Sequence, residues 1–225
     1  MSKNNADQLR ARLRGLRQSM SVAERQQASA ALCARLQHWF DERLAESSVA
    51  RRSSPLIVAG FWPMADEPDL RPLLRWLDLN QVIICLPVIV ERNTPLEFHC
   101  WTPDTQLSAQ AFGVMEPPRQ QALVPEILLV PTLGFTPQAA RLGYGGGYYD
   151  RSLAALQRAG TKPLKIGVAW QQGLLTEADA FVPQPHDVVL DTIATPEGWL
   201  PANPVKKTID TILNPLAPYK KRLKS

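Results

Sequence analysis

Apolar residues along the chain follow two spacings, one typical of helices and one typical of buried strands. Residues 6–46 have the helical spacing, and Ser21 with Glu24 predicts a capping box that starts a second helix there. Residues 70–79 and the stretch that begins at Tyr149 and ends before Gly160 predict two more helices. Short apolar runs, each predicted as a strand, occupy residues 56–62, 82–90, 96–101, 127–130 and 165–170.

This alternation of strands and helices predicts an α/β fold. We expect one layered domain over residues 1–200, with a central, mostly parallel sheet flanked by helices in a Rossmann-like three-layer arrangement and a helical segment at the N-terminus. Residues 201–225 are rich in proline and lysine, and we expect a basic, poorly ordered extension there.

The net charge of the chain comes from that extension. The 225 residues carry a formal charge of +4, but residues 205–225 hold six basic side chains against Asp210, a net of +5. The remainder is therefore close to neutral at −1, which argues against a nucleic-acid partner for the body of the protein. A tail that binds RNA or a membrane surface stays a separate alternative.

The cysteine pattern and the hydropathy of the chain indicate the compartment. Cys33, Cys85 and Cys100 are an odd number without C-x-x-C spacing, which is typical of reduced thiols in a cytoplasm. The first eight residues are polar, and no apolar run approaches the ~18 residues of a membrane span. We therefore expect a cytoplasmic protein without a membrane segment.

The candidate chemistry centres on residues 141–151, where four glycines fall within five positions. A predicted strand precedes this segment and a predicted helix follows it. Glycine backbone can approach a ligand closely, and a helix N-terminus favours an anion, so the segment suits a phosphate. It matches neither the Walker A loop nor the G-x-G-x-x-G dinucleotide motif. A merely mobile turn is the alternative, and the neighbouring Arg141, Asp150 and Arg151 favour a phosphate and metal site.

Two further segments carry candidate polar groups. Arg10, Arg14 and Arg17 share one side of the first predicted helix, which is either a solvated basic face or a surface for a polyphosphate. Residues 63–69 form an acidic, turn-rich segment just after a predicted strand, at the edge of an α/β sheet where ligands bind.

Two specific motifs and several weaker segments carry a family resemblance. The specific motifs are residues 130–135 (VPTLGF) and 141–150 (RLGYGGGYYD); the weaker segments are Leu9-Arg10 with Arg17, residues 64–69, Leu86-Pro87, Phe112-Gly113 with Glu116-Pro117, and residues 185–187. From about residue 9 to about residue 195 the chain resembles the 5-formyltetrahydrofolate cyclo-ligase family, also called methenyltetrahydrofolate synthetases.

The resemblance implies an ATP-dependent and Mg²⁺-dependent ligase that acts as a monomer. Such enzymes convert 5-formyltetrahydrofolate to 5,10-methenyltetrahydrofolate with release of ADP and phosphate, by phosphorylation of the formyl oxygen and attack by N10. The alternative from a different class is a nucleotide- or folate-binding regulatory module without catalysis. Retention of both candidate metal ligands, Asp150 and Asp187, favours the enzyme.

The resemblance also implies roles for individual residues. Arg141 and Tyr148 match catalytic positions, and Asp150 and Asp187 match metal-ligand positions that suit Mg²⁺. The implied nucleotide contacts are Arg10, Arg14, Arg141, Leu142, Gly143, Tyr144, Gly145, Gly146, Gly147, Tyr148 and Tyr149. The implied folate contacts are Trp62, Glu67, Tyr144, Gly145, Gly146, Gly147 and Tyr148.

Each of these roles has a structural alternative, and the chain departs from the family pattern at two positions. Trp62 could belong to the core, Asp150 could interact with a helix dipole, and Tyr149 could serve packing alone. A basic residue usual in the family is replaced by Ala6, for which Lys3 or Arg14 could supply the charge. Leu70 stands where the family often has threonine.

Overall fold

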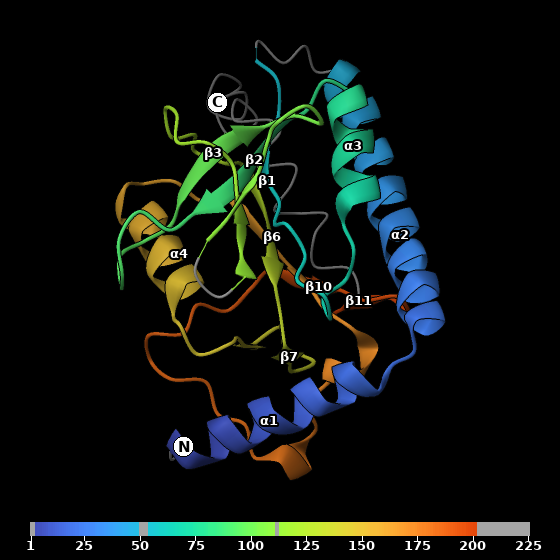
Figure 1. Ribbon diagram of the computed structural model, residues 1–225, viewed down its shortest axis with the longest axis vertical. Coiled ribbons are helices and arrows are strands. Elements are labelled where there is room, and N and C mark those ends of the chain that lie inside the picture. The colour runs from blue at the N-terminus through green and yellow to red at the C-terminus, as the bar shows by residue number, and fades with distance from the viewer. Residues whose placement is uncertain (1–2, 50–53, 111–112, 202–225) are drawn as a thin grey trace, which may run out of the picture.

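A seven-stranded sheet in the order β11-β10-β9-β6-β1-β2-β3 forms the centre of the fold (Figure 1). Its strands are β1 (Ile57–Ala59), β2 (Ile83–Val88), β3 (Glu97–Trp101), β6 (Ile127–Pro131), β9 (Leu164–Val168), β10 (Thr192–Ala194) and β11 (Trp199–Leu200). The inner strands pair in parallel, whereas β3 and β11 join the two edges antiparallel. The predicted mostly parallel sheet is confirmed.

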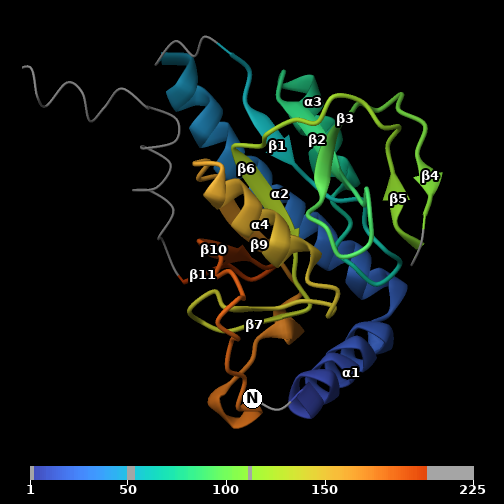
Figure 2. The same ribbon diagram turned by 90° about the vertical axis from the view of Figure 1, so that its left-hand side faces the viewer.

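Helices cover both faces of this sheet. The four α-helices are α1 (Lys3–Ser19), α2 (Val22–Val49), α3 (Arg71–Leu79) and α4 (Tyr148–Arg158). Figures 1 and 2 show α2 and α3 together on one face and α4 on the other. The predicted three-layer α/β arrangement is therefore confirmed, with α1 as the expected N-terminal helical segment.

The computed structural model describes residues 3–49, 54–110 and 113–201. The expectation of a poorly ordered basic extension falls almost entirely on residues 202–225, which lie outside the described residues. The boundary between a domain and an extension therefore stays a prediction. In the described part, no helix is long and apolar enough to span a membrane.

Alternation along the buried strands produces two apolar layers. On the face under α2 and α3, Phe40 and Leu74 pack in one cluster with Ile84 of β2. On the opposite face, Leu153 of α4 packs in a second cluster with Cys85 and other strand residues. Because consecutive strand residues point to opposite faces, Ile84 and Cys85 contribute to different layers.

Local sequence signals predict the start of α2 correctly but not its end. The capping box is present, since the Ser21 N–H donates to the Glu24 carboxylate at 2.6 Å and the Glu24 N–H to Ser21 Oγ at 3.2 Å. The helix that it starts runs to Val49, three residues past the expected end. The expected loop after β3 contains a small hairpin of β4 (Ser108–Ala109) and β5 (Met115–Glu116).

The carboxyl ends of β1, β6 and β9 lie at one edge of the sheet, and the candidate residues gather there. A short hairpin of β7 (Gly134–Phe135) and β8 (Arg141–Leu142) follows β6 and leads into the glycine segment and α4. Helix α1 lies across this edge (Figure 1). The 3₁₀ turns η2 (Gln171–Gly173) and η3 (Glu177–Asp179), which follow β9, complete the set of described helices.

Helix α1 is held at this edge by a small apolar cluster of its own. Leu9 and Leu13 are buried against Leu133, Leu142 and Leu175. This cluster is separate from the two that fill the layers beside the sheet. The position of α1, and of every arginine on it, therefore depends on few apolar contacts.

We predict that Leu13→Ala releases α1 while the sheet stays folded. Leu13 is 2% exposed, and deletion of a buried leucine side chain costs about 2–5 kcal/mol. Hydrogen exchange should accelerate across α1 and remain slow in β6 and β9. Leu16→Ala, at a position 40% exposed on the same helix, is the matched control and should change little. Equal exchange rates in α1 for the two variants would contradict this account of its docking.

Candidate functional site

The glycine segment has backbone conformations that residues other than glycine rarely adopt. Gly145 has a φ of 98° and Gly147 a φ of 65°, both in the left-handed region. Gly147 also precedes the first turn of α4, which has no side-chain cap. The first N–H groups of α4 therefore lie next to the turn, as an anion site at a helix N-terminus requires.

Three guanidinium groups hold this turn by its carbonyl oxygens. The pairs are Arg10 Nε to Gly143 O at 2.9 Å, Arg14 Nη2 to Tyr144 O at 3.4 Å, and Arg151 Nη2 to Gly146 O at 2.8 Å. In a trans peptide the N–H points opposite to the carbonyl, so each bond directs the following N–H away from its arginine. Gly145 and Gly146 are exposed, which leaves their backbone accessible to a ligand.

The basic stripe of α1 therefore contacts the glycine segment. Arg10 and Arg14 reach its backbone, as the phosphate-site hypothesis requires, whereas Arg17 turns inward. Ala6 stands where the family usually has a basic residue, and it packs against the apolar cluster under α1. Arg14 places a positive charge beside Tyr144. The side chain of Lys3 lies outside the described residues.

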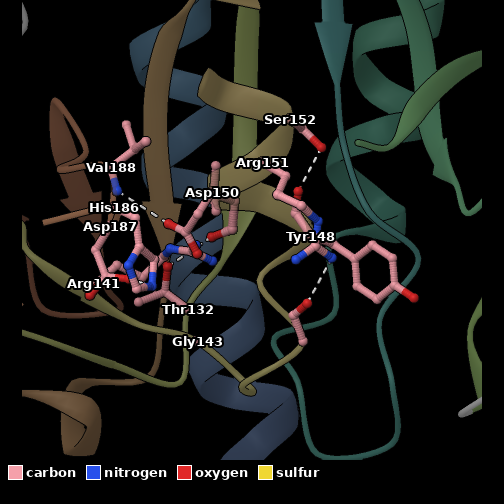
Figure 3. Close-up of polar contacts among 12 residues, drawn as sticks. Thr132, Arg141, Gly143, Tyr148, Asp150, Arg151, Ser152, His186, Asp187 and Val188 are labelled. Carbon is pink, nitrogen blue, oxygen red and sulfur yellow. Dashed lines mark hydrogen bonds and ion pairs between the residues drawn. The ribbon is translucent and has the colours of Figure 1, made fainter. Parts of the chain in front are cut away.

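Asp150 in the first turn of α4 is held on both carboxylate oxygens. Its Oδ2 accepts from Arg141 Nη2 at 2.8 Å, and its Oδ1 accepts from the Val188 N–H at 3.2 Å. Arg141 is 8% exposed, and its Nε finds no hydrogen-bond partner among the described residues. Figure 3 shows Arg141, Asp150, His186 and Asp187 gathered on one side of α4.

Asp187 lies one residue before Val188 and so belongs to the same region as Asp150. Its Oδ2 accepts from the Gln184 N–H at 2.7 Å, and its Oδ1 is 3.8 Å from Nε2 of the exposed His186. No group of three or more acidic, histidine or cysteine ligands occurs in the described part of the chain. Two carboxylates nevertheless fit Mg²⁺, which commonly takes one or two and completes its shell with phosphates and waters.

Glu67 is the most deeply buried acidic side chain of the acidic segment, at 7% exposed. Its Oε2 accepts from the Met64 N–H at 2.9 Å, and its Oε1 accepts from the Tyr144 hydroxyl at 2.6 Å. Burial raises the pKa of Glu67 above its usual range, while these two hydrogen bonds and the charge of Arg17 oppose the rise. Glu67 is therefore a buried carboxyl group and not a solvated one.

The aromatic candidates Trp62 and Tyr148 have different neighbours. Trp62 is half-buried between Trp101, 6.0 Å away between ring centroids, and the guanidinium of Arg71 at 5.8 Å. Tyr148 points away from the Asp150 cluster (Figure 3), with the Arg151 guanidinium 4.9 Å from its ring centroid. Trp62 is thus both a core contact and a partly exposed ring, so its structure accommodates both interpretations.

Tyr149 and Leu70 both pack in the apolar clusters beside the sheet. The Tyr149 hydroxyl is buried without a hydrogen-bond partner among the described residues, and burial and the charge of Glu67 raise its pKa. Leu70, at the second departure from the family pattern, is fully buried in the cluster beneath α2 and α3.

Two residues of the site were not among the implied ligands. Arg17 is 3% exposed and donates to the Tyr144 hydroxyl and to the carbonyl oxygen of Thr132, at the end of β6. The spacing of Arg10, Arg14 and Arg17 indicates that Arg17 lies on the same side of the helix as the other two. Thr132 contributes a backbone atom, for which the sequence holds no signal.

Comparison with known proteins connects this geometry to one family. A sequence model of the 5-formyltetrahydrofolate cyclo-ligase family matches residues 2–196. The 5-formyltetrahydrofolate cyclo-ligase of Mycolicibacterium smegmatis is 31% identical over 208 residues, which cover 88% of this chain and 96% of that protein. The enzyme of the same name from Haemophilus influenzae is 26% identical, over 76% of this chain and 88% of that protein.

Solved structures agree with these sequence matches. The chain is similar to the 5,10-methenyltetrahydrofolate synthetase of Aquifex aeolicus, with a TM-score of 0.66 and 26% identity over 86% of this chain and 91% of that one. The synthetase of Mycoplasma pneumoniae has the same fold, with a TM-score of 0.62 and 22% identity over 85% of this chain and 98% of that one.

We predict that Glu67→Gln removes a pH dependence of stability. The pKa of Glu67 is raised from 4.5 in the fold, so the stability of the wild type falls as pH rises from about 4.5 through that raised value. Glutamine lacks this ionisation. The stability of the variant relative to the wild type should therefore increase as pH rises from 4 to 8.

Urea unfolding of the two proteins between pH 4 and pH 8 measures this difference. The difference between their free energies of unfolding should change as pH rises and then become constant. A difference that is constant over this range would show that ionisation of the buried carboxyl group does not cost stability.

Proposed function

Because the chain belongs to the 5-formyltetrahydrofolate cyclo-ligase family, it converts 5-formyltetrahydrofolate to 5,10-methenyltetrahydrofolate, and we propose that it does so with ATP and Mg²⁺ at the glycine segment. The observation that carries the proposal is the held turn at residues 143–147. Three arginines bind its carbonyls, which directs the N–H group after each of them away from its arginine, and the turn lies next to the N-terminus of α4.

The reaction needs a phosphoryl donor for a chemical reason. The N5-formyl group is an amide, whose carbon is a poor electrophile and whose oxygen does not leave. Transfer of the γ-phosphoryl group of ATP to that oxygen makes it part of a phosphate leaving group. N10 then bonds to the carbon, the carbon–oxygen bond breaks, the N10 proton is lost and phosphate departs. The protein contributes mainly orientation and charge neutralisation.

Nucleotide phosphates are assigned to the glycine segment and the arginines around it. Backbone N–H groups of Gly145, Gly146 and Gly147 would donate hydrogen bonds to phosphate oxygens, with Arg10 and Arg14 beside them. Arg141 would neutralise charge at the transferring group, because its guanidinium is buried at the same place and its Nε lacks a partner in the described structure. The remaining proposed nucleotide contacts are Leu142, Gly143, Tyr144, Tyr148 and Tyr149.

Asp150 and Asp187 are assigned to Mg²⁺. A bound Mg²⁺ would offset the negative charge of the phosphate groups. Both carboxylates accept hydrogen bonds from backbone N–H groups, which fixes their orientation. Asp150 also pairs with Arg141, so the cation and Arg141 compete for Asp150 Oδ2.

The folate is assigned to the side of the turn that faces the acidic segment. Glu67 would accept hydrogen bonds from N–H groups of the pterin ring, and the exposed part of Trp62 would pack against that ring. Tyr148, which points away from the Asp150 cluster, would lie where folate and phosphate meet (Figure 3). The glycine segment lies between the two sets of contacts, because Tyr144 contacts Glu67 on one side and α1 on the other.

A monomer in the cytoplasm remains our expectation for the intact enzyme. The three cysteines of the chain are free thiols in the structure. Oligomeric state and the absence of a nucleic-acid partner stay predictions.

We predict that Asp150→Asn removes Mg²⁺-dependent turnover without unfolding the protein. Asparagine retains the shape of the side chain, but it is a much weaker ligand for a hard cation. Absorbance of 5,10-methenyltetrahydrofolate, followed with 5-formyltetrahydrofolate, ATP and varied Mg²⁺, should show kcat lower by about a hundredfold or more.

Asp191→Asn is the matched control for this experiment. Asp191 accepts from the backbone N–H of Lys165 and pairs with its ammonium group, so it resembles Asp150 in its contacts. It lies at the start of β10, at the opposite edge of the sheet, and its replacement should leave turnover and Mg²⁺ dependence unchanged. If Asp150→Asn kept wild-type turnover, the metal assignment would be wrong.

We predict that Gly145→Ala weakens nucleotide binding. A Cβ there would be strained at a φ of 98° and would meet Arg10 Cζ at 3.4 Å. Gly160→Ala has a similar backbone strain, at a φ of 80°, with nothing within 4 Å of the added atom. Both variants should lose about 1–2 kcal/mol of stability, but the KM for ATP should rise about tenfold or more in Gly145→Ala alone. An equal KM in both variants would remove the glycine segment from the nucleotide site.

A further inference from the structure

The Tyr144 hydroxyl links a buried arginine to the buried carboxylate of the site. It accepts from Arg17 Nη1 and donates to Glu67 Oε1 at 2.6 Å. Arg17 comes from α1 and Glu67 from the acidic segment after β1, so the hydroxyl joins elements far apart in sequence. A hydroxyl can act as donor and acceptor at once, and Tyr144 uses both capacities here.

The direction of the two bonds is fixed by Arg17. A guanidinium only donates, because it is charged at all relevant pH and has no acceptor atom. Its Nη2 is held by the Thr132 carbonyl, and the side chain is 3% exposed. Nη1 therefore donates to the Tyr144 oxygen, and the phenolic proton is directed to Glu67.

This arrangement specifies how Glu67 must be used. Oε1 accepts from Tyr144 and Oε2 accepts from the Met64 N–H, so each oxygen faces a fixed donor. A protonated Glu67 would place its own O–H against one of these donors and lose that hydrogen bond. The remaining lone pairs of the carboxylate are available for a ligand N–H.

We propose that Arg17 and Tyr144 are a positioning pair that orients the Glu67 carboxyl group toward the N–H groups of the pterin ring. The inference rests on the proposed function of Glu67 as a folate contact. It adds that folate affinity depends on a phenol and a guanidinium that need not touch the folate themselves. It also makes the docking of α1 a condition for folate binding, in addition to its proposed contacts with phosphates.

The charged and titratable neighbours of Glu67 come from every element packed against it. They are Arg17 of α1, Tyr144 of the glycine segment, Tyr149 of α4 and Asp66 of its own segment. Arg17 and the Tyr144 hydrogen bond lower the pKa of Glu67, whereas burial and Asp66 raise it. Both phenols stay neutral, because burial raises the pKa of each. Loss of the Tyr144 hydroxyl should therefore raise the pKa of Glu67.

The test is Tyr144→Phe, which removes one oxygen atom and keeps the ring. Binding of 5-formyltetrahydrofolate is measured by calorimetry without ATP between pH 5.5 and pH 9, so that turnover does not contribute. We expect the Kd to rise about tenfold or more near pH 7. The loss of folate affinity at low pH should also begin at a higher pH than in the wild type. The KM for ATP should change much less than the KM for the folate.

Two further variants distinguish a loss of Glu67 orientation from a general loss of folded structure. In a Glu67→Gln background, Tyr144→Phe should have less than about a twofold effect, because the carboxylate that it orients is gone. Arg17→Lys keeps the charge but lacks the planar fork that reaches Thr132 and Tyr144 together, so its pH profile should lie between those of wild type and Tyr144→Phe. Thermal unfolding of each variant confirms that it folds.

The outcomes distinguish this inference from the proposed function. If Glu67→Gln binds the folate as tightly as the wild type, the folate contact is wrong and the inference fails with it. If Glu67→Gln loses affinity but Tyr144→Phe keeps the wild-type Kd and pH profile, the positioning pair is wrong and the folate contact stands. Loss of affinity in both, with a low-pH loss that begins at higher pH in Tyr144→Phe and no added effect in the double variant, supports the pair.

Discussion

Hydrogen bonds from arginine to backbone carbonyls are the constraint on which the site depends. Four carbonyl oxygens, those of Thr132, Gly143, Tyr144 and Gly146, accept from guanidinium groups. A glycine segment has few side chains with which to hold itself, so its conformation must be fixed through its backbone. Binding the carbonyls fixes the peptide planes and directs the N–H group that follows each carbonyl away from its arginine. If phosphates bind at this turn, the same arginines would supply both its shape and the positive charge.

Burial of Glu67 opposes stability and serves recognition. A carboxylate removed from water is destabilised unless donors replace the lost hydration, and Tyr144 and Met64 supply one donor each. The raised pKa shows that the compensation is incomplete. Because the two donors do not fully replace the lost hydration, the Glu67 carboxylate can still gain from further hydrogen bonds. A ligand with N–H groups can donate them. A site that was fully satisfied in the empty protein would have less to gain from binding.

The sequence predicted what depends on local pattern and missed what depends on tertiary contact. The capping box at Ser21, the three-layer arrangement and the clustering around the glycine segment follow from spacing and residue type, and the structure has all three. The inward turn of Arg17 does not, because α1 presents two arginines to the loop and buries the third only once it docks on Leu133 and Leu142. Likewise, the resemblance marks Glu67 as a folate contact, but only its tertiary neighbours show that its carboxyl group is buried.

The pairing of Asp150 with Arg141 connects the metal and the phosphates energetically. In the described structure each neutralises the other, at 2.8 Å and largely out of solvent. A cation that takes Asp150 leaves Arg141 as a buried, unpaired positive charge, which is costly unless an anion arrives with the cation. In the proposed reaction a nucleotide phosphate would be that anion and would arrive with Mg²⁺. The ion pair would then disfavour binding of the free cation or the free phosphate and favour binding of the two together.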